Sequence, residues 1–209
     1  MPLSSNGKFS CMTTIEDIRR QLAARSPQIL IDASKTPAAV ALVLYQGRGA
    51  LQLLFIERSK RAGDPWSGHI AFPGGKVEAC DRDLRAAAER ETLEEIGLDL
   101  GTAAYLGRFD DLTGLTLPVL VSGFVYAVEN SATLVLNDEV REVFWKPLAA
   151  LADAERWVQH GVFYGGADHV HPGIDLLGPG RPVLWGLTYR FVVQLLQLAG
   201  CAVPGTENR

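Results

Sequence analysis

The first part of the chain alternates between helical and strand-like hydrophobic spacing. Apolar residues recur every three to four positions behind Thr13 or Thr14, either of which can cap a helix, so a helix is predicted as far as Arg25. Its apolar positions are Ile15, Ile18 and Leu22. The apolar runs at residues 38–45 and 51–58 flank a glycine-containing turn, which predicts two buried strands joined as a hairpin.

The rest of the chain shows the same mixture of patterns. Further strands are predicted at residues 104–109, 118–128, 143–147 and 155–164, with one or two helical turns at residues 147–153. Gly123 lies inside the second of these and is a signal for a bulge or bend. Residues 185–199 carry large apolar side chains at helical spacing, which predicts a closing helix. Helices and strands mixed in this order predict the α/β (α+β) class.

Composition narrows the class of protein. With 209 residues, of which 47% are hydrophobic, the chain can bury a core, so we expect one domain over residues 1–209, with residues 1–35 as an N-terminal extension and cover helix. The net charge of −4 argues against nucleic-acid binding, because a protein that neutralises many phosphates carries a basic face. The sequence shows neither a membrane-spanning run nor a secretory core at its start, so a cytoplasmic protein is expected.

Residues 64–98 combine a glycine loop with a glutamate-rich helix. The Pro-Gly-Gly turn at residues 73–75 can bend sharply and approach a ligand closely. Three carboxylates follow at positions i, i+3 and i+4, which share one face of a helix. They belong to Glu91, Glu94 and Glu95. Leu93 and Ile96 are expected to point away from this face, into a core.

Two interpretations of this helix are open. Arg85 with Glu89 and Arg90 with Glu94 have i,i+4 spacing, and charged helix faces are usually solvated. Alternatively, carboxylates beside closely approaching backbone form a site for a hard divalent cation, Mg²⁺ or Mn²⁺, which would bind substrate phosphates. The glycine loop before the helix and the Gly97 that follows it favour the second interpretation.

Cationic, aromatic and histidine side chains raise further alternatives. A cationic group just upstream of the loop forms either a solvated turn or an anion-steering rim. Its members are Arg58, Lys60 and Arg61. His69 and Phe72 either line the substrate side or pack beside the turn. His169 and His171 alternate on a predicted edge strand and have the spacing of a metal pair, but without further ligands an exposed or hydrogen-bonded pair is favoured.

Residues 90–98, Arg-Glu-Thr-Leu-Glu-Glu-Ile-Gly-Leu, resemble the signature of the Nudix hydrolases, R-E-x-x-E-E-x-G before an aliphatic residue, with Thr92 in a usually aliphatic position. The resemblance implies an α/β/α sandwich with a mixed sheet, Mg²⁺ or Mn²⁺, and hydrolysis of a nucleoside diphosphate linked to another group. The implied metal ligands are Gly75, through its carbonyl, Glu91, Glu94 and Glu95. Catalytic roles are implied for Glu91, acting also on the water, and for Arg90, orienting a carboxylate.

The first half of the signature departs from the usual one. The spacing from Gly75 to Arg90 is one residue longer, and Asp81 stands where glutamate is usual. Asp81, with Glu78 behind it, is either the early acidic group or a residue that caps or precedes the helix. The longer spacing and the segments LLFIERS, GHIAFPGG and WGLTYR resemble the coenzyme A diphosphatase branch, although that branch shows arginine at the position of Asp64.

We therefore expect metal-dependent hydrolysis of coenzyme A or acyl-coenzyme A to phosphopantetheine and adenosine 3′,5′-bisphosphate. ADP-ribose or another nucleoside diphosphate derivative is the alternative substrate, and a non-catalytic nucleotide-binding module is the alternative class. Glu139 is a further catalytic candidate, as base or ligand, or else a solvated acid beside Arg141. The expected partner is a small-molecule nucleotide, with no nucleic acid and no membrane, and a homodimer is allowed.

Overall fold

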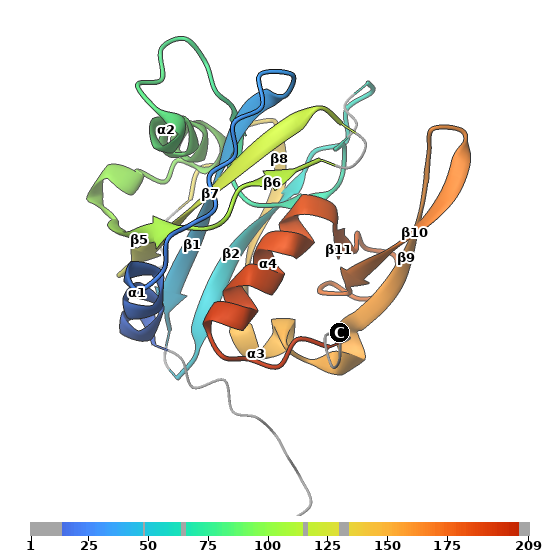
Figure 1. The fold of residues 1–209 in the computed structure, drawn as a ribbon. Coiled ribbons are helices and arrows are strands. Elements are labelled where there is room, and N and C mark those ends of the chain that lie inside the picture. The colour runs from blue at the N-terminus through green and yellow to red at the C-terminus, as the bar shows by residue number, and fades with distance from the viewer. Residues whose placement is uncertain (1–13, 48, 64–65, 115–116, 130–133, 205–209) are drawn as a thin grey trace, which may run out of the picture.

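A computed structural model describes residues 14–47, 49–63, 66–114, 117–129 and 134–204 (Figure 1). Asp64 and Thr13 lie outside the described residues. The helices of the described part are α1 (Ile15–Ala23), α2 (Leu84–Ile96), α3 (Leu148–Leu151) and α4 (Gly186–Leu198), with 3-10 turns at Leu100–Thr102 and Ala154–Arg156. The strands are β1 (Thr36–Gln46), β2 (Leu51–Arg58), β3 (Ile70–Ala71), β4 (Gly74–Lys76), β5 (Ala104–Arg108), β6 (Leu112–Thr113), β7 (Val119–Val128), β8 (Val140–Pro147), β9 (Trp157–Tyr164), β10 (Ala167–Ile174) and β11 (Leu184–Trp185).

The larger sheet is built around β1 and β7, which run parallel from the pair Thr36–Val119 to the pair Tyr45–Val128. β2 pairs antiparallel with β1, which confirms the predicted hairpin, and it also pairs with β3 and β8. β5 and β6 pair with β7, and β4 pairs with β1. Parallel and antiparallel pairs therefore coexist, which confirms the predicted mixed sheet.

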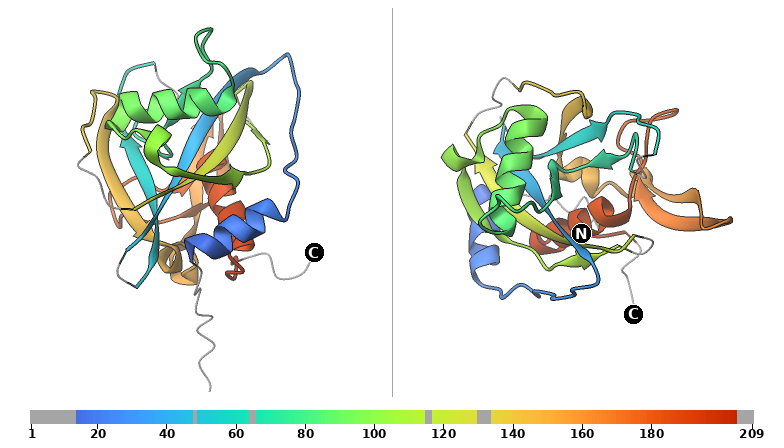
Figure 2. Two further views of the ribbon diagram at one scale, coloured as in Figure 1. Left: turned by 90° about the vertical axis from the view of Figure 1, so that its left-hand side faces the viewer. Right: turned by 90° about the horizontal axis from the view of Figure 1, so that it is seen from above.

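Both faces of this sheet are covered. Leu42 and Leu44 of β1 belong to the hydrophobic core that includes α1 and α4, whereas Ala41 and Val43 belong to the core beneath α2. Because successive side chains of a strand point to opposite faces, the continuous apolar run of β1 serves both cores. Figure 2 shows the sheet between α2 and α4. The predicted α/β/α sandwich is confirmed.

α1 is the predicted N-terminal helix, although it ends at Ala23 rather than Arg25. The backbone N–H of Asp17 donates to the Thr14 hydroxyl, and the Asp17 carboxylate accepts the N–H of Thr14, which together form a capping box. Ile18 and Leu22 are buried in the core that contains α4. α1 therefore covers part of the sheet, and the division into a domain and an extension stays a prediction.

The chain after β8 forms a second sheet of three strands. β9 and β10 pair antiparallel from Tyr164–Ala167 to Trp157–Ile174, and β11 pairs with the end of β10. These two longer strands project from the body of the molecule as a hairpin, drawn in orange (Figure 1). α4 begins at Gly186, one residue after the predicted start, and contacts β10 and β11.

Gly123 has a different role from the predicted one. The pairing of β1 with β7 runs through Gly123 without interruption, so the predicted bulge is wrong. The irregularity lies in β5, between Tyr105 and Gly107. A Cβ on Gly123 would lie 2.6 Å from the ring of Phe191 in α4. The missing side chain therefore gives α4 room to pack against β7.

Candidate functional site

The loop before α2 brings backbone into close contact with its surroundings. Gly74 has a φ of 149°, and a Cβ at this position would lie 2.2 Å from the carbonyl oxygen of Ala39 in β1. A Cβ on Gly75 would lie 2.4 Å from the carboxyl carbon of Glu91. The backbone of β1 requires glycine at position 74, whereas a side chain at position 75 would displace the Glu91 carboxylate. The turn consequently holds the chain directly against β1 and the helix glutamates.

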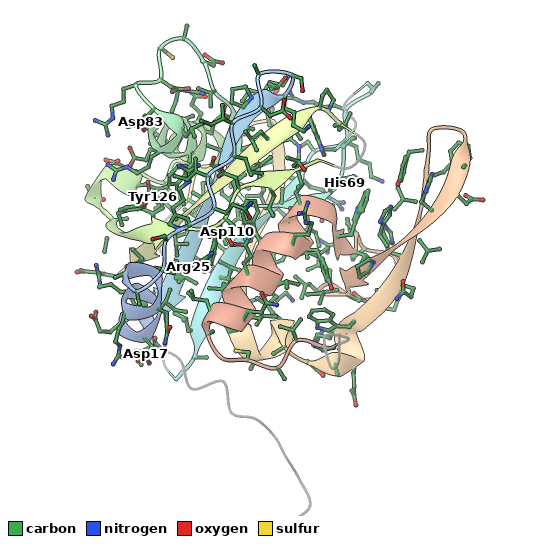
Figure 3. All side chains as sticks on the ribbon, in the orientation of Figure 1. Asp17, Arg25, His69, Asp83, Asp110 and Tyr126 are labelled. Atoms are coloured by element: carbon green, nitrogen blue, oxygen red, sulfur yellow. The ribbon has the colours of Figure 1, made fainter. Side chains whose placement is uncertain are left out.

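α2 has a cap at each end. The N–H of Ala86 donates to Asp83, which lies at the start of the helix (Figure 3), and Gly97 ends the helix in the left-handed conformation with a φ of 68°. Between the caps, buried residues at positions i, i+4, i+7 and i+8 form one stripe. They are Ala88, Thr92, Glu95 and Ile96. One of the predicted site glutamates thus lies on the buried side of the helix.

The buried stripe differs from the predicted one. Ile96 is buried as expected, but Leu93 is 50% exposed, so the prediction that Leu93 points into a core is wrong. Thr92 takes the buried position instead. Its hydroxyl donates to the Ala88 carbonyl at 2.7 Å, which satisfies a polar group that would otherwise be costly inside the protein.

Arg90 connects the loop to the helix. Its Nε and Nη2 donate to the two oxygens of Asp81, each at 3.0 Å, and Nη2 also donates to the Lys76 carbonyl at 3.2 Å. Its Nη1 donates to Glu91 at 3.0 Å and to Glu94 at 3.1 Å, which confirms the i,i+4 pair. A single planar guanidinium therefore fixes three carboxylates and one carbonyl around the loop.

Asp81 lies in the loop that precedes the helix and does not cap it. The cap is Asp83, whereas both Asp81 oxygens bind Arg90 and one also accepts the N–H of Glu78. The Arg90 guanidinium holds the pKa of Asp81 below its usual range. Asp81 stays ionised at neutral pH and anchors Arg90.

Glu95 is the most enclosed carboxylate of the site. Its side chain is 3% exposed, its Oε2 accepts the N–H of Gly74 at 2.9 Å, and its Oε1 lies 3.5 Å from Nη1 of Arg58. Burial raises the pKa of Glu95 to about 7, although the Gly74 N–H and Arg58 favour the charged form. Near neutral pH the Glu95 carboxyl is therefore a mixture of the protonated and the ionised form.

Glu139, just before β8, is brought to the same side by the fold. Its carboxylate lies 3.2 Å from Nη1 of Arg61 and 3.9 Å from Nη2 of Arg58. Arg141, the neighbour expected for a solvated Glu139, instead binds the fully buried Glu57. The Glu139 side chain is 42% exposed and forms ion pairs with Arg58 and Arg61, so its role as a catalytic group or a solvated acid stays a prediction.

The site glutamates repel one another. Burial raises the pKa of Glu91 against the effect of Arg90, and the charges of Glu94 and Glu139 add to the rise. Among the described residues, no three acidic, histidine or cysteine side chains are gathered into a preformed metal cluster. The donors are carboxylate and carbonyl oxygens, which hard divalent cations prefer, and a cation would relieve the repulsion between them. The donor chemistry fits Mg²⁺ or Mn²⁺.

The predicted cationic rim divides into two parts. Arg58 and Arg61 point to the site, because both approach Glu139. Lys60 is exposed and its aliphatic stem lies beside Gly68, where a Cβ would be 3.5 Å from Lys60 Cγ. Two of the three predicted rim cations therefore meet site carboxylates.

The two predicted aromatic residues also differ from each other. Phe72 is 2% exposed and its ring stacks on Phe55, with ring centroids 5.1 Å apart, so the contacts shown are those of a core residue. His69 is half-buried, and its ring meets Trp185 edge-on at 5.3 Å. A role in substrate binding stays a prediction for both.

His169 and His171 lie on β10 with aromatic neighbours. The Tyr164 hydroxyl and Nε2 of His171 form a hydrogen bond of 3.1 Å, and the Tyr164 ring stacks on His169 at 3.9 Å. In the part of the chain that the structure describes, no third ligand completes a metal site with them. The favoured interpretation, a hydrogen-bonded pair, is confirmed for His171.

Sequence reasoning missed the contacts that join distant segments. The contact of Arg58 with Glu95 and the bidentate bond of Asp81 with Arg90 have no local sequence pattern. The N–H of Gly74 as a donor to Glu95 was likewise not expected. The one available signal was the Pro-Gly-Gly turn, which predicts close backbone but not its partner.

The sequence of the chain is similar to that of a known family of proteins. A family model described as the NUDIX domain matches residues 35–164. The chain is 32% identical to the human mitochondrial coenzyme A diphosphatase NUDT8, over 99% of this chain and 88% of that protein. It is 26% identical to an uncharacterized Nudix hydrolase, NudL, of Citrobacter koseri, over 87% of this chain and 93% of the relative.

A solved structure shares the fold. The MutT/nudix family protein from Enterococcus faecalis aligns with a TM-score of 0.50 at 16% identity, over 90% of this chain and 75% of that one.

Within the described segments, no helix has both the length and the apolar character needed to cross a bilayer.

Proposed function

This chain belongs to the Nudix family and is a pyrophosphohydrolase, and from that premise we propose that it cleaves the diphosphate of coenzyme A or acyl-coenzyme A. The observation that carries the substrate is the similarity, along 99% of the chain, to a human protein named as a coenzyme A diphosphatase. The segments LLFIERS, GHIAFPGG and WGLTYR add support. The proposed products are phosphopantetheine and adenosine 3′,5′-bisphosphate.

The reaction breaks one anhydride bond. The oxygen of a water molecule bonds to one phosphorus, the bridging oxygen leaves with the other phosphate, and the water gives up a proton. Nudix hydrolases generally need divalent metal ions. A bound Mg²⁺ or Mn²⁺ supplies charge neutralisation for the diphosphate and for the leaving oxygen.

The chain's own residues would divide this work. The proposed metal ligands are the Gly75 carbonyl, Glu91, Glu94 and Glu95. Arg90 keeps Glu91 and Glu94 in place through the bonds of its Nη1. Either Glu91 or Glu139 takes the proton of the attacking water. Arg58, Arg61 and Lys60 would attract the substrate phosphates, with His69 on the substrate side and Phe72 packed in the core.

A substrate screen tests this proposal. Purified protein is assayed with Mg²⁺ or Mn²⁺ on coenzyme A, acyl-coenzyme A, ADP-ribose, NADH, dinucleoside polyphosphates and dNTPs. We expect coenzyme A or its acyl form to show the highest kcat/KM. Efficient turnover of ADP-ribose without turnover of coenzyme A would overturn the assignment of coenzyme A as the substrate. If no diphosphate is turned over, a non-catalytic nucleotide-binding module is favoured.

Matched variants of one helix test the site. Glu91→Gln is expected to lower kcat by at least about 100-fold, because it removes a proposed ligand and water-activating group. Glu89→Gln changes the same charge on the same helix, but Glu89 faces Arg85 and Tyr126. Equal activity of both variants would show that the proposed metal face is misplaced.

Location and assembly stay predictions. The expectation of a cytoplasmic protein stands beside a human relative whose name places that relative in mitochondria. A small-molecule nucleotide is the proposed partner. A homodimer remains to be measured, for which size-exclusion chromatography with light scattering is sufficient.

A further inference from the structure

All four histidines of the chain gather with a tyrosine and a tryptophan at the base and inner face of the β9–β10 hairpin. We call this set the ring row. Its members are His69, His160, Tyr164, His169, His171 and Trp185. They come from three separate parts of the sequence, so the row exists only in the folded chain. None of the steps proposed for the diphosphate uses it, apart from the single residue His69.

Much of the row is a stack of nearly parallel rings. Tyr164 and His169 lie 3.9 Å apart with 11° between their planes, and Tyr164 and His171 lie 5.8 Å apart at 19°. His171 continues the stack to Trp185, at 5.5 Å and 29°. At its inner end Trp185 meets His69 and His160 at steeper angles, 68° and 51°. The rings of Tyr164, His169 and His171 therefore share nearly one orientation along the hairpin, and Trp185 continues this row at a larger angle.

The two faces of the hairpin differ in exposure. Directly opposed residues of antiparallel strands share a face, so His160 and His171 are neighbours on the inner one. The row residues on this face are all half-buried. On the outer face Phe163 is 70% exposed and Val170 is 67% exposed. The rings therefore gather on the side of the hairpin that turns towards the body of the molecule.

The row begins beside the catalytic site. The carbonyl of His69 accepts the N–H of Arg58 at 3.0 Å, and the guanidinium of Arg58 lies 3.5 Å from Glu95. His69 lies on the side of the molecule that faces the hairpin (Figure 3). The backbone of His69, at the inner end of the row, is therefore one hydrogen bond away from the residue whose guanidinium lies beside Glu95.

An ion pair holds this second sheet in place. Arg181, just before β11, bonds to Glu57 at 2.7 Å and also to Glu142. Glu57 is fully buried and immediately precedes Arg58. The Trp185 end of the row is thus fixed to the same strand, β2, that carries the site arginine.

We propose that the inner end of the ring row, His69, His171 and Trp185, stacks on the purine base of the nucleotide substrate. The inference rests on the proposed function for its substrate class. Aromatic and imidazole rings offer flat faces to a base, and their nitrogens offer hydrogen bonds to its edge.

Two substrates and paired variants test the proposal. One substrate is coenzyme A, and the other is an analogue with the same diphosphate in which a methyl group replaces adenosine. His171→Ala and Trp185→Leu are expected to lower kcat/KM for coenzyme A by about 10-fold, the effect of losing a base-stacking surface, and to leave the analogue unchanged. Trp185→Phe, which keeps a ring, is expected to retain most of the activity.

Val170→Ala is the matched control, since Val170 neighbours His171 on β10 but lies on the outer face. It should behave as the wild type on both substrates. Three results would each overturn the base site. In the first, His171→Ala and Trp185→Leu lower kcat/KM equally for both substrates, and in the second they lower it for neither. In the third, Val170→Ala has the same effect as His171→Ala.

A binding measurement separates this proposal from the proposed function. Calorimetric titration with AMP requires no turnover. Binding of AMP that His171→Ala weakens by about 10-fold supports the base site even if coenzyme A is not hydrolysed. Hydrolysis of coenzyme A with AMP binding unchanged in His171→Ala overturns the base site and leaves the proposed function standing.

Discussion

Arg90 shows how one side chain can organise a site. It bonds to Asp81, Glu91, Glu94 and the Lys76 carbonyl at the same time. These bonds use donors that point in different directions within one rigid plane, an arrangement that the single ammonium group of lysine does not offer. A positive charge alone is therefore not enough at position 90 to hold these four groups, and the planar guanidinium is needed.

Arg90→Lys is expected to lower kcat/KM by about 10- to 100-fold, the usual effect of disturbing groups that orient metal ligands. Arg85→Lys is the control, because Arg85 forms an i,i+4 pair with Glu89 at 3.2 Å on the same helix. Steady-state kinetics with a metal titration measures the effect, and melting curves check folding. Similar kinetics for both variants would contradict the role of the guanidinium geometry.

Glu95 makes the stability of the folded protein depend on pH. Its pKa is about 7 in the folded protein, against an ordinary value of 4.5. Between these pH values the folded chain binds more protons than the unfolded chain, so the stability of the metal-free protein falls as pH rises from 4.5 to 7. Glu95→Gln abolishes this titration.

In EDTA at pH 8, Glu95→Gln is expected to raise the free energy of unfolding by about 1 to 3 kcal/mol. The gain should shrink towards pH 5, where the wild-type carboxyl is mostly protonated. Urea unfolding at several pH values measures it, with Glu94→Gln as control because Glu94 is 55% exposed. A destabilised Glu95→Gln protein at pH 8 would refute the effect.

At the scale of elements, the loop and α2 form one unit. The loop places Gly75 against Glu91, while the N–H of Gly74 binds Glu95 one turn farther along the helix. Asp83 and Gly97 define the ends of that helix. The position of the glutamates relative to the loop therefore depends on two adjacent glycines with different constraints.

Alanine at these two glycines should separate function from stability. Gly75→Ala brings a methyl group against the movable Glu91 side chain, so we expect activity to fall by about 10-fold or more with little change in stability. Gly74→Ala meets the fixed Ala39 carbonyl at a positive φ, so we expect stability to fall by about 1 to 3 kcal/mol. Activity assays and urea unfolding of both variants test these two expectations. A loss of stability in Gly75→Ala with a loss of activity alone in Gly74→Ala would refute them.

At the scale of the whole molecule, the mixed sheet brings the site together. Arg58 at the end of β2, Glu139 before β8 and Glu95 on α2 are distant in sequence but within one set of ionic contacts. On the opposite face, α4 packs its Phe191 against Gly123 of β7. The closeness of this packing depends on the absence of one methyl group.

Gly123→Ala is expected to lower the free energy of unfolding by about 1 to 3 kcal/mol, because its Cβ would lie 2.6 Å from the Phe191 ring. Gly161→Ala is a control within another strand, where a Cβ meets nothing within 4 Å. Adding Phe191→Leu should relieve part of the Gly123→Ala loss. Urea denaturation of the single and double variants tests this, and additive losses would contradict the proposed clash.

The sequence by itself determined most of the longer helices and strands and the second half of the glutamate motif. The hairpin of β1 and β2, α4 and the face with Glu91 and Glu94 follow from local periodicity, which chain neighbours fix. The same periodicity wrongly predicted that Leu93 is buried, because the burial of a helix face depends on what packs against it.

Only the tertiary structure decided which distant groups meet. It placed Glu139 beside Arg58 and Arg61, bound Asp81 to Arg90, and brought His69 to the three histidines of one hairpin through Trp185. It also assigned Gly123 to helix packing instead of a bulge. These contacts depend on strand order and register, which bring together residues that share no local pattern, so no window of sequence contains them.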